Sequence, residues 1–244
     1  MSLLEVDGVS RRFGGLQAIH RLSFHLEDGE VLGLIGPNGA GKTTAFNLVS
    51  GFLAPDAGEI RFRGRSLRGL RPHAVCALGL ARTFQIVRPF PGLSLLDNVK
   101  VGALARHPRP GQARERARQV VERVGLGPKA EMLARMLTLA DRKRLELARA
   151  LATEPTLLLL DEVMAGLTPA ETQAMVDLIA GLNGDGVSVL LIEHNMRAVM
   201  ALSHRIVVLS FGEKLAEGLP DEVAANPRVI EAYLGESYVD PAGH

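Results

Sequence analysis

Runs of apolar residues separated by polar turns recur along the chain and predict its strands. Residues 3–9 and 19–26 open the sequence, and the second run alternates at Leu22, Phe24 and Leu26, as expected of a half-buried strand. The chain therefore begins with a β-rich segment. Further strands are predicted over residues 31–35, 59–62, 79–84, 156–161, 187–193 and 205–209.

Two of these runs are apolar throughout rather than alternating. Four consecutive leucines occupy residues 157–160, and residues 187–193 are almost as apolar, which suits strands buried on both faces of a parallel sheet. Residues 95–152 follow a helical pattern interrupted by proline and glycine, and residues 169–182 predict another helix. Alternating strands and helices predict an α/β fold with a parallel sheet, into which the stretch near residues 100–150 is inserted.

Composition narrows the possibilities only slightly. The 244 residues allow one large domain, or one core with a smaller appended lobe. The formal net charge of +1 gives no overall reason to expect a nucleic-acid partner. Between Lys100 and Ala150, however, thirteen Lys and Arg face five Asp and Glu. This local excess indicates either a solvated helical surface or a docking face for a partner or an anionic surface.

The single cysteine and the apolar segments bear on location. Cys76 has no second cysteine to pair with, which excludes an intramolecular disulfide and a cysteine-based zinc site. Its apolar neighbours predict that it is buried. The N-terminus lacks a basic region followed by an apolar stretch, so no secretory signal is expected. No apolar run approaches the ~20 residues that span a bilayer, so we expect a cytoplasmic protein that reaches a membrane only through a partner.

The segment after residues 31–35 carries the strongest chemical signal, because it fits the phosphate-binding pattern G-x-x-x-x-G-K-[ST]. Its glycines let backbone N–H groups approach an anion, and the start of the following helix adds unpaired N–H groups. Lys42 can reach the β- and γ-phosphates, and the Thr43 hydroxyl can bind Mg²⁺. An ordinary glycine-rich surface loop is the alternative. The residues predicted to bind nucleotide here are Gly36, Pro37, Asn38, Gly39, Ala40, Gly41, Lys42, Thr43 and Thr44.

Polar residues follow the predicted central strands. Asp161 ends the leucine-rich strand, at the edge where open α/β sheets bind ligands, and its carboxylate can hold Mg²⁺ opposite Thr43. Glu162 points elsewhere, because successive side chains alternate in extended chain, and it suits a residue that polarises a water molecule. His194 ends the next apolar strand and Gln85 follows the strand near residue 84. His194 is expected within reach of the γ-phosphate, and Gln85 can bind Mg²⁺ or water beside the phosphates. The ordinary alternatives are a helix cap or turn for the Asp-Glu pair, a structural histidine for His194 and a polar loop residue for Gln85.

Together these residues resemble the ATP-binding subunits of ABC transporters over essentially the whole chain. The resemblance implies a P-loop NTPase core with an N-terminal antiparallel β part and an inserted α-helical lobe. The core would comprise residues 1–94 and 152–237, the lobe residues 95–151, and a frayed tail residues 238–244. The matched elements are Phe13 for adenine stacking, residues 36–44 for the phosphate loop, Gln85 for the Q-loop, residues 157–161 for the second nucleotide motif, Glu162 for the catalytic glutamate, residues 165–168 for the D-loop and His194 for the switch histidine.

The resemblance also implies a mechanism and partners. Two such subunits close head to tail on two ATP molecules and move transmembrane permease subunits, while water positioned by Glu162 and His194 hydrolyses ATP. Lys42 and Mg²⁺ would carry much of the electrostatic work. The protein would lie at the cytoplasmic face of the inner membrane and serve a solute-binding protein indirectly, with no nucleic acid involved. Segments such as Phe-Gly-Gly-Leu at 13–16 and Ile-Glu-His-Asn-Met at 192–196 are similar to the branched-chain amino-acid importer ATPases, in particular the subunit with Phe-Gly-Gly-Leu.

Two positions depart from the family pattern. The signature Leu-Ser-Gly-Gly-Gln is replaced by Leu-Thr-Leu-Ala-Asp at residues 137–141, and Val163 stands where a proline usually follows the glutamate. Thr138 keeps a hydroxyl for nucleotide and fits a capping box with Asp141, whose charge Arg142 is expected to offset. Both signature glycines are missing. We therefore expect intact nucleotide binding, with closure that is weak or that depends on a partner.

Alternatives remain open at this point. A soluble ABC ATPase of DNA repair or translation is one, although the chain has neither a long coiled coil nor a second cassette. A hydrolysis-poor regulatory cassette in a heterodimer is another. Residues 86–93 are apolar and aromatic, and either line a groove for a permease helix or pack locally. The cargo does not follow from the sequence, because in this family the cassette does not touch it.

Overall fold

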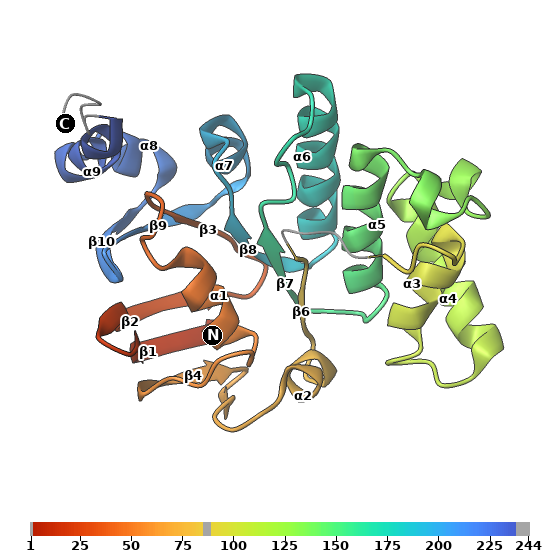
Figure 1. Cartoon of the computed structure of the whole chain (residues 1–244), viewed down its shortest axis with the longest axis horizontal. Coiled ribbons are helices and arrows are strands. Elements are labelled where there is room, and N and C mark those ends of the chain that lie inside the picture. Colours follow the sequence, from red (N-terminus) through yellow and green to blue (C-terminus); the bar gives the residue numbers. More distant parts are fainter. Residues whose placement is uncertain (1, 85–88, 238–244) are drawn as a thin grey trace.

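The computed structural model describes residues 2–84 and 89–237. A six-stranded sheet forms its centre, in the order β10-β9-β3-β8-β7-β6 (Figure 1). All neighbours in this sheet are parallel except β10, which pairs antiparallel with β9. The strands are β3 (Val31–Ile35), β6 (Leu80–Arg82), β7 (Leu157–Asp161), β8 (Ser188–Ile192), β9 (Arg205–Ser210) and β10 (Glu213–Gly218).

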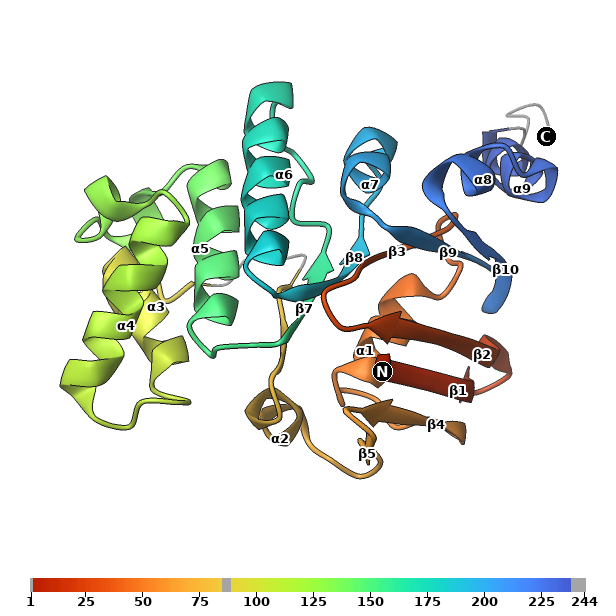
Figure 2. The ribbon, with the colours of Figure 1, turned by 180° about the vertical axis from the view of Figure 1, so that it is seen from behind.

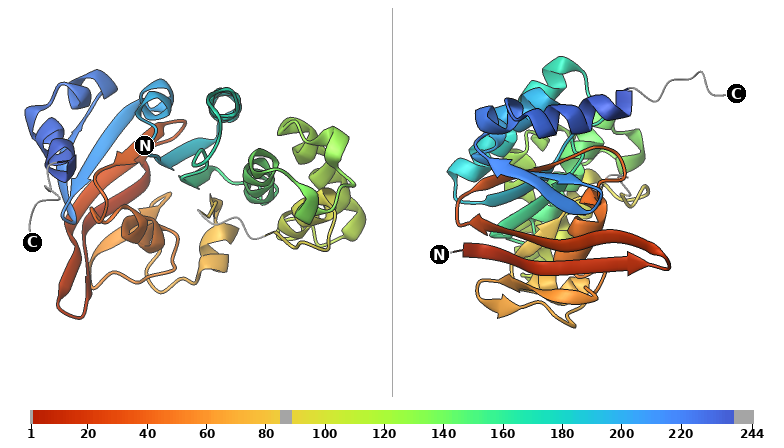
Figure 3. Two further views of the ribbon diagram at one scale, coloured as in Figure 1. Left: turned by 45° about the horizontal axis from the view of Figure 1, so that its top comes forward. Right: turned by 90° about the vertical axis from the view of Figure 1, so that its left-hand side faces the viewer.

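A second, antiparallel sheet carries the N-terminal part of the chain, in the order β2-β1-β4-β5. It appears as a long hairpin with short strands beside it (Figure 3, right). The first two strands extend beyond the predicted apolar runs, because backbone pairing continues through Arg11 and Arg12 to a turn at Gly14. The strands are β1 (Ser2–Phe13), β2 (Leu16–Glu27), β4 (Ala57–Phe62) and β5 (Arg65–Ser66).

Helix α1 (Lys42–Val49) lies between the two sheets. Its Phe46 is fully buried in one cluster with Leu4 and Phe62 of the antiparallel sheet and Leu34 and Leu159 of the central sheet. The even-numbered leucines of β7 face the opposite side, because side chains alternate along a strand. They share one buried cluster with Ile179 and Leu182 of α6 (Pro169–Gly184), a helix that lies beside β7 in Figure 2. The apolar runs at 157–160 and 188–192 are therefore buried on both faces, as predicted.

Helices complete the remaining surfaces. At one end of the molecule lie α8 and α9, with α7 between them and α6, and at the other end the helical lobe contains α3, α4 and α5 with two short 3-10 turns (Figure 1). The short helix α2 precedes β6. The bounds are α2 (Pro72–Ala77), α3 (Leu95–Ala103), α4 (Pro110–Arg123), η1 (Gly127–Lys129), η2 (Ala134–Met136), α5 (Leu139–Leu151), α7 (Met196–Leu202), α8 (Pro220–Ala224) and α9 (Pro227–Ser237).

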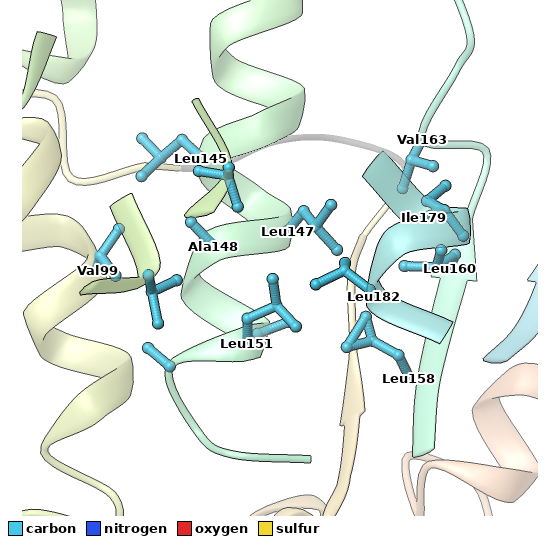
Figure 4. Packing of buried hydrophobic residues seen from close by; sticks show 14 of the residues in the cluster. Val99, Leu145, Leu147, Ala148, Leu151, Leu158, Leu160, Val163, Ile179 and Leu182 are labelled. Atoms are coloured by element: carbon cyan, nitrogen blue, oxygen red, sulfur yellow. The ribbon is translucent and has the colours of Figure 1, made fainter. Parts of the chain in front are cut away.

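Helix α5 joins the lobe to the central sheet. In Figure 4 its Ala148 faces Val99 of α3, whereas Leu147 and Leu151 face Leu158 of β7 and Leu182 of α6. All of these residues except Leu151 have at most 2% of their surface exposed. Burial of such a leucine stabilises the fold by about 1.5–3 kcal/mol. The helix is thus packed on two sides, against the lobe and against the central sheet with α6.

Three expectations are settled by the fold. Cys76 is half-buried rather than buried, because α2 is short and presents it to a surface hollow. The strand predicted over 79–84 spans only Leu80–Arg82. The basic excess belongs in part to a solvated surface, since Arg114 and Arg123 of α4 pair with exposed Glu131 and Asp185. Within the described residues, no helix combines the length and apolar character needed to cross a bilayer.

Candidate nucleotide-binding site

The segment predicted to bind phosphate forms a tight loop between β3 and α1. A Cβ on Gly36 would lie 2.2 Å from the carbonyl oxygen of Leu209, and one on Gly41 would lie 2.7 Å from that of Ala18. Both glycines also have positive φ, so a larger residue at either position would cause both a steric clash and backbone strain. Gly41 is the N-cap of α1, and no side chain caps this helix in the described chain. The loop therefore offers backbone N–H groups and the positive end of the helix dipole to an anion.

Lys42 lies under this loop with only 7% of its surface exposed. Its Nζ donates hydrogen bonds to the carbonyl oxygens of Gly36 at 2.5 Å and Pro37 at 2.8 Å. These contacts hold the ammonium group against the loop that would wrap a phosphate chain. Gly39, with φ of +74° and open space where its Cβ would be, keeps the outer side of the loop accessible. The geometry matches an anion cradle with a fixed positive charge.

A hollow of about 380 Å³ lies over the loop, within the usual ~300–1,000 Å³ of small-molecule sites. Its lining includes the apolar side chains of Phe13, Leu16 and Phe211 and the polar side chains of Thr43, Glu162 and His194. Phe13 is 44% exposed, and the Arg11 guanidinium lies 5.1 Å from its ring centre. Aromatic side chains beside a phosphate-binding loop suit a nucleotide, which has a base and a phosphate chain.

Phe211 is a lining residue that the sequence analysis missed. It is 93% exposed, with a positive φ of 48°, in the turn between β9 and β10. Phe211 lines the hollow together with Phe13 and Leu16, so three apolar side chains border the same site. In the sequence the only available signal was an aromatic residue directly before Gly212, between two strands, which by itself indicates nothing more than a turn.

Asp161 lies at the carboxyl end of β7, where the sequence placed it. Its Oδ2 accepts a hydrogen bond of 2.8 Å from Arg82, and the two side chains are 4% and 7% exposed. Arg82 also donates to Asn47 Oδ1 at 2.6 Å. The guanidinium therefore balances the charge of the Asp161 carboxylate in this structure. Arg82 was not predicted to have this role from the sequence.

Glu162 and His194 follow the neighbouring strands β7 and β8, and their side chains contact each other. The Glu162 Oε1 and His194 Nε2 atoms lie 3.0 Å apart. The backbone of Glu162 is left-handed, with φ of 50°, and its N–H donates to the Ile192 carbonyl at 2.9 Å. A left-handed glutamate is strained, and this backbone turns the side chain away from that of Asp161. The two adjacent carboxylates thus have different partners, Arg82 and His194.

Of the remaining predicted residues, Gln85 falls outside the described part of the chain. Thr138 is the N-cap of α5 and accepts a hydrogen bond from the Asp141 N–H at 3.2 Å, but it does not line the hollow. The second half of the expected capping box differs, because the Asp141 carboxylate accepts a bond from the Thr138 hydroxyl rather than from its backbone.

The charge of Asp141 is offset by a different residue than expected. Lys129 Nζ donates to its carboxylate at 2.6 Å, whereas Arg142 donates to the Arg135 carbonyl. Burial acts to raise the pKa of Asp141, but the bonds from Lys129 and Thr138 outweigh it and leave the pKa lowered. Lys129 comes from the segment before the helix, so this pairing depends on how the lobe folds back on itself.

The donor set also fits a bound Mg²⁺ ion. The Thr43 hydroxyl and the Asp161 carboxylate are oxygen ligands of the kind that this ion prefers. In the described part of the chain, no group of three or more His, Cys, Asp or Glu could hold a metal by itself. Mg²⁺ commonly takes most of its ligands from phosphate oxygens and water, so two protein ligands are sufficient.

Comparison with known proteins agrees with this geometry. A family model described as ABC transporter matches residues 19–165. The chain belongs to this family. Residues 213–239 match a second model, described as branched-chain amino acid ATP-binding cassette transporter. The recognition made from the sequence is thereby confirmed, and the chain is an ATPase of the ABC type.

Relatives and solved structures extend the similarity over nearly the whole chain. It is 43% identical to the high-affinity branched-chain amino acid transport ATP-binding protein LivG of Salmonella typhimurium and 42% identical to BraF of Pseudomonas aeruginosa. Each alignment covers 96% of this chain and 98% of the relative. A crystal structure of the ADP conformation of an ATP-binding cassette superposes with a TM-score of 0.88 at 28% identity, covering 96% of this chain and 99% of that one. The predicted fold class is confirmed.

Proposed function

We propose that this cassette hydrolyses ATP to drive the import of branched-chain amino acids. The single observation that supports hydrolysis most directly is the Glu162–His194 pair, 3.0 Å apart, in the lining of the hollow over the phosphate loop. The cargo class is supported by the similarity to LivG and BraF over 96% of the chain and by the match at residues 213–239.

In the proposed site, each residue has a separate task. Phe13 and Phe211 flank the adenine, backbone N–H groups of residues 36–44 bind the phosphates, and Lys42 contacts the β- and γ-phosphates. Thr43 and Asp161 would hold Mg²⁺, which would supply neutralising charge for the phosphate oxygens. Asp161 would then no longer need Arg82 as its countercharge. Positioning and charge neutralisation supply most of the rate acceleration in phosphoryl transfer.

Glu162 acts as the base for the attacking water. Its carboxylate is only 15% exposed, so it is sheltered from bulk solvent while remaining part of the lining. His194 donates to that carboxylate and orients it, in the manner of a base held by a third group. A base of this kind contributes about 10²–10⁴-fold to the rate. Gln85 is proposed to contact Mg²⁺ or the water and to respond when the γ-phosphate leaves.

Permease subunits are proposed to dock at the hollow between the core and the helical lobe. This hollow has a volume of about 320 Å³ and is bordered by Phe52 and Phe84 of the core and by Val101 and Arg149 of the lobe. Arg149 also stacks on Phe90, at 5.4 Å from the ring centre, so this residue of the expected docking segment lies beside the same hollow. The cassette would then lie at the cytoplasmic face of the membrane, held by the permease.

A hydrolysis-poor cassette in a heterodimer is the second candidate, and a specific contact favours it. Leu139 replaces a signature glycine and covers Gly166 of the expected D-loop, where an added Cβ would lie 3.0 Å from the Leu139 Cδ2. A side chain at this position occupies space that a glycine would leave for phosphate. Thr138 is the remaining hydroxyl that could contact nucleotide on an opposite subunit.

Light scattering on Glu162→Gln, with and without Mg-ATP, separates the two candidates. A shift from monomer to dimer, together with loss of phosphate release, supports an ATPase that forms its own catalytic pair. A persistent monomer with confirmed ATP binding supports the heterodimer. Glu213→Gln is a matched control, because Glu213 pairs with His20 at 2.7 Å outside the site. Normal phosphate release by Glu162→Gln would remove the proposed base.

A further inference from the structure

Lys143 is a buried lysine on the signature helix α5 that the proposed chemistry does not use. It is 5% exposed, although lysine is almost never buried without a partner. Its Nζ donates a hydrogen bond of 2.9 Å to the backbone carbonyl oxygen of Glu162. A residue of the helical lobe thus contacts the main chain of the proposed catalytic base, 19 residues away in sequence.

This contact is one of two hydrogen bonds that hold the strained backbone of Glu162. The Glu162 N–H is held by the Ile192 carbonyl at 2.9 Å, and the carbonyl is held by Lys143. With φ at 50°, the residue adopts a conformation that persists only where its surroundings enforce it. Val163 follows where the family commonly has proline, so the ring that would restrict this backbone is absent. The hydrogen bond from Lys143 restrains the backbone here, where no proline does so.

Glu193 holds the same loop from the other side. Its carboxylate accepts the N–H of Met164 at 2.8 Å and is itself 4% exposed. Burial lowers the pKa of Lys143, and the negative charges opposing this effect come first from Glu193 and then from Glu162. A buried ammonium and a buried carboxylate therefore bracket residues 162–164.

A second contact from α5 reaches the far end of this loop. Leu139 lies one helical turn before Lys143, so both side chains project from the same face of the helix. Leu139 covers Gly166, whose φ is +79°. One face of α5 therefore contacts the loop of residues 162–166 at its first and last residues.

We propose that Lys143 is a positioning residue. Together with Leu139, it couples the position of the helical lobe to the orientation of the Glu162 carboxylate. The inference rests on the proposed catalytic role of Glu162. Because α5 carries both contacts, a displacement of the lobe relative to β7 shifts the Glu162 backbone with it. Misplacing a catalytic group by about 1 Å can cost about 100-fold in rate. The altered signature segment would thereby help to position the catalytic base of its own subunit.

The test compares Lys143→Met with the double variant Lys143→Met/Glu193→Gln. The single variant removes the hydrogen bond and leaves Glu193 without the compensating charge. The double variant removes both charges, while the amide oxygen introduced at position 193 still accepts the Met164 N–H. Arg144→Met is the matched control, because Arg144 is the next residue on α5 and its guanidinium lies near Gly125. Each protein is assayed for kcat, KM, ATP affinity and melting temperature.

We expect kcat to fall about 30- to 100-fold in both Lys143 variants, with ATP affinity within about 3-fold of the parent protein. The melting temperature should fall in the single variant and recover in the double variant, and Lys143→Arg should restore part of kcat. Recovery of kcat together with stability in the double variant would overturn the proposal, since Lys143 would then only balance charge. Glu162→Gln is assayed in parallel. If it turns over normally, the role of Glu162 fails, whereas its inactivity beside a fully active Lys143→Met refutes only the coupling.

Discussion

Replacement of Arg82 by Met tests whether this arginine substitutes for a cation at Asp161. The Arg82–Asp161 pair is 2.8 Å long and almost fully buried, so Arg82→Met leaves the Asp161 carboxylate in the interior without its countercharge. Breaking a buried pair in this way costs about 3–5 kcal/mol. Because 1 kcal/mol shifts the melting temperature of a domain of this size by about 2–4 °C, the variant should melt about 6–20 °C below the parent protein.

Mg-ATP should reduce the difference in melting temperature between Arg82→Met and the parent protein, and ATP without Mg²⁺ should not. When Mg²⁺ reaches Asp161, it supplies the missing countercharge in the variant, whereas in the parent protein it must displace Arg82. The stabilisation by saturating Mg-ATP, about 4 kcal/mol at 1,000 times Kd, should therefore be larger in the variant. Thermal unfolding is followed without ligand, with Mg-ATP, and with ATP plus EDTA. The gap should close by about half only when Mg²⁺ is present.

Arg205→Met is the matched control for this experiment. Arg205 is also partly buried and pairs with Glu30 at 2.9 Å, but it lies on β9 away from the hollow. Its variant should be destabilised by an amount that Mg-ATP does not change. Equal shifts with Mg-ATP and with ATP plus EDTA in Arg82→Met would refute the reasoning. A melting temperature within about 2 °C of the parent protein would refute the assigned cost of the broken pair.

Three further predictions concern other parts of the chain. Lys42→Ala should abolish ATP binding, because it removes the ammonium held at Gly36 and Pro37; unchanged affinity for labelled ATP would contradict its role. Phe90→Ala should weaken co-purification with permease subunits while leaving ATP affinity unchanged, and the reverse pattern would place Phe90 in the nucleotide site. Asp141→Asn should destabilise the protein at neutral pH. The folded-state pKa of Asp141 is lowered, so its contribution is present above the unfolded value near 3.8 and is lost as the pH falls through the folded value. Melting curves of Asp141→Asn and the parent protein should therefore converge in acid, and a constant difference between them would contradict this sign.

Local features of the sequence were sufficient to predict the phosphate loop and the central strands. Gly36, Gly41 and Lys42 are neighbours in the chain, and their function depends on backbone conformations that the residues themselves favour. The apolar runs at 157–160 and 188–192 likewise indicate burial without reference to any other segment. The positions of Glu162 and His194 followed from the rule that ligands gather at the carboxyl ends of parallel strands.

Local pattern was less informative where backbone pairing or surface shape decides the outcome. Strand β1 continues through Arg11 and Arg12 because β2 offers partners there, which no apolar alternation signals. Cys76 has apolar neighbours in sequence but borders a hollow, since burial depends on what covers a helix. Phe211 was missed because its exposure at the rim of the nucleotide hollow depends on how the β9–β10 turn lies beside β2.

The pairs that set the electrostatics of the site arise only in the folded protein. Arg82 meets Asp161 because β6 runs parallel to β7, with Arg82 in register with Leu159. Lys143 meets the Glu162 carbonyl because α5 packs on the same strand. These contacts join residues that are far apart in the chain, and their formation depends on strand order, register and helix packing. The sequence alone therefore determined which chemical groups are available. The tertiary structure decided which of these groups form ion pairs and which hydrogen bonds orient the proposed catalytic residue.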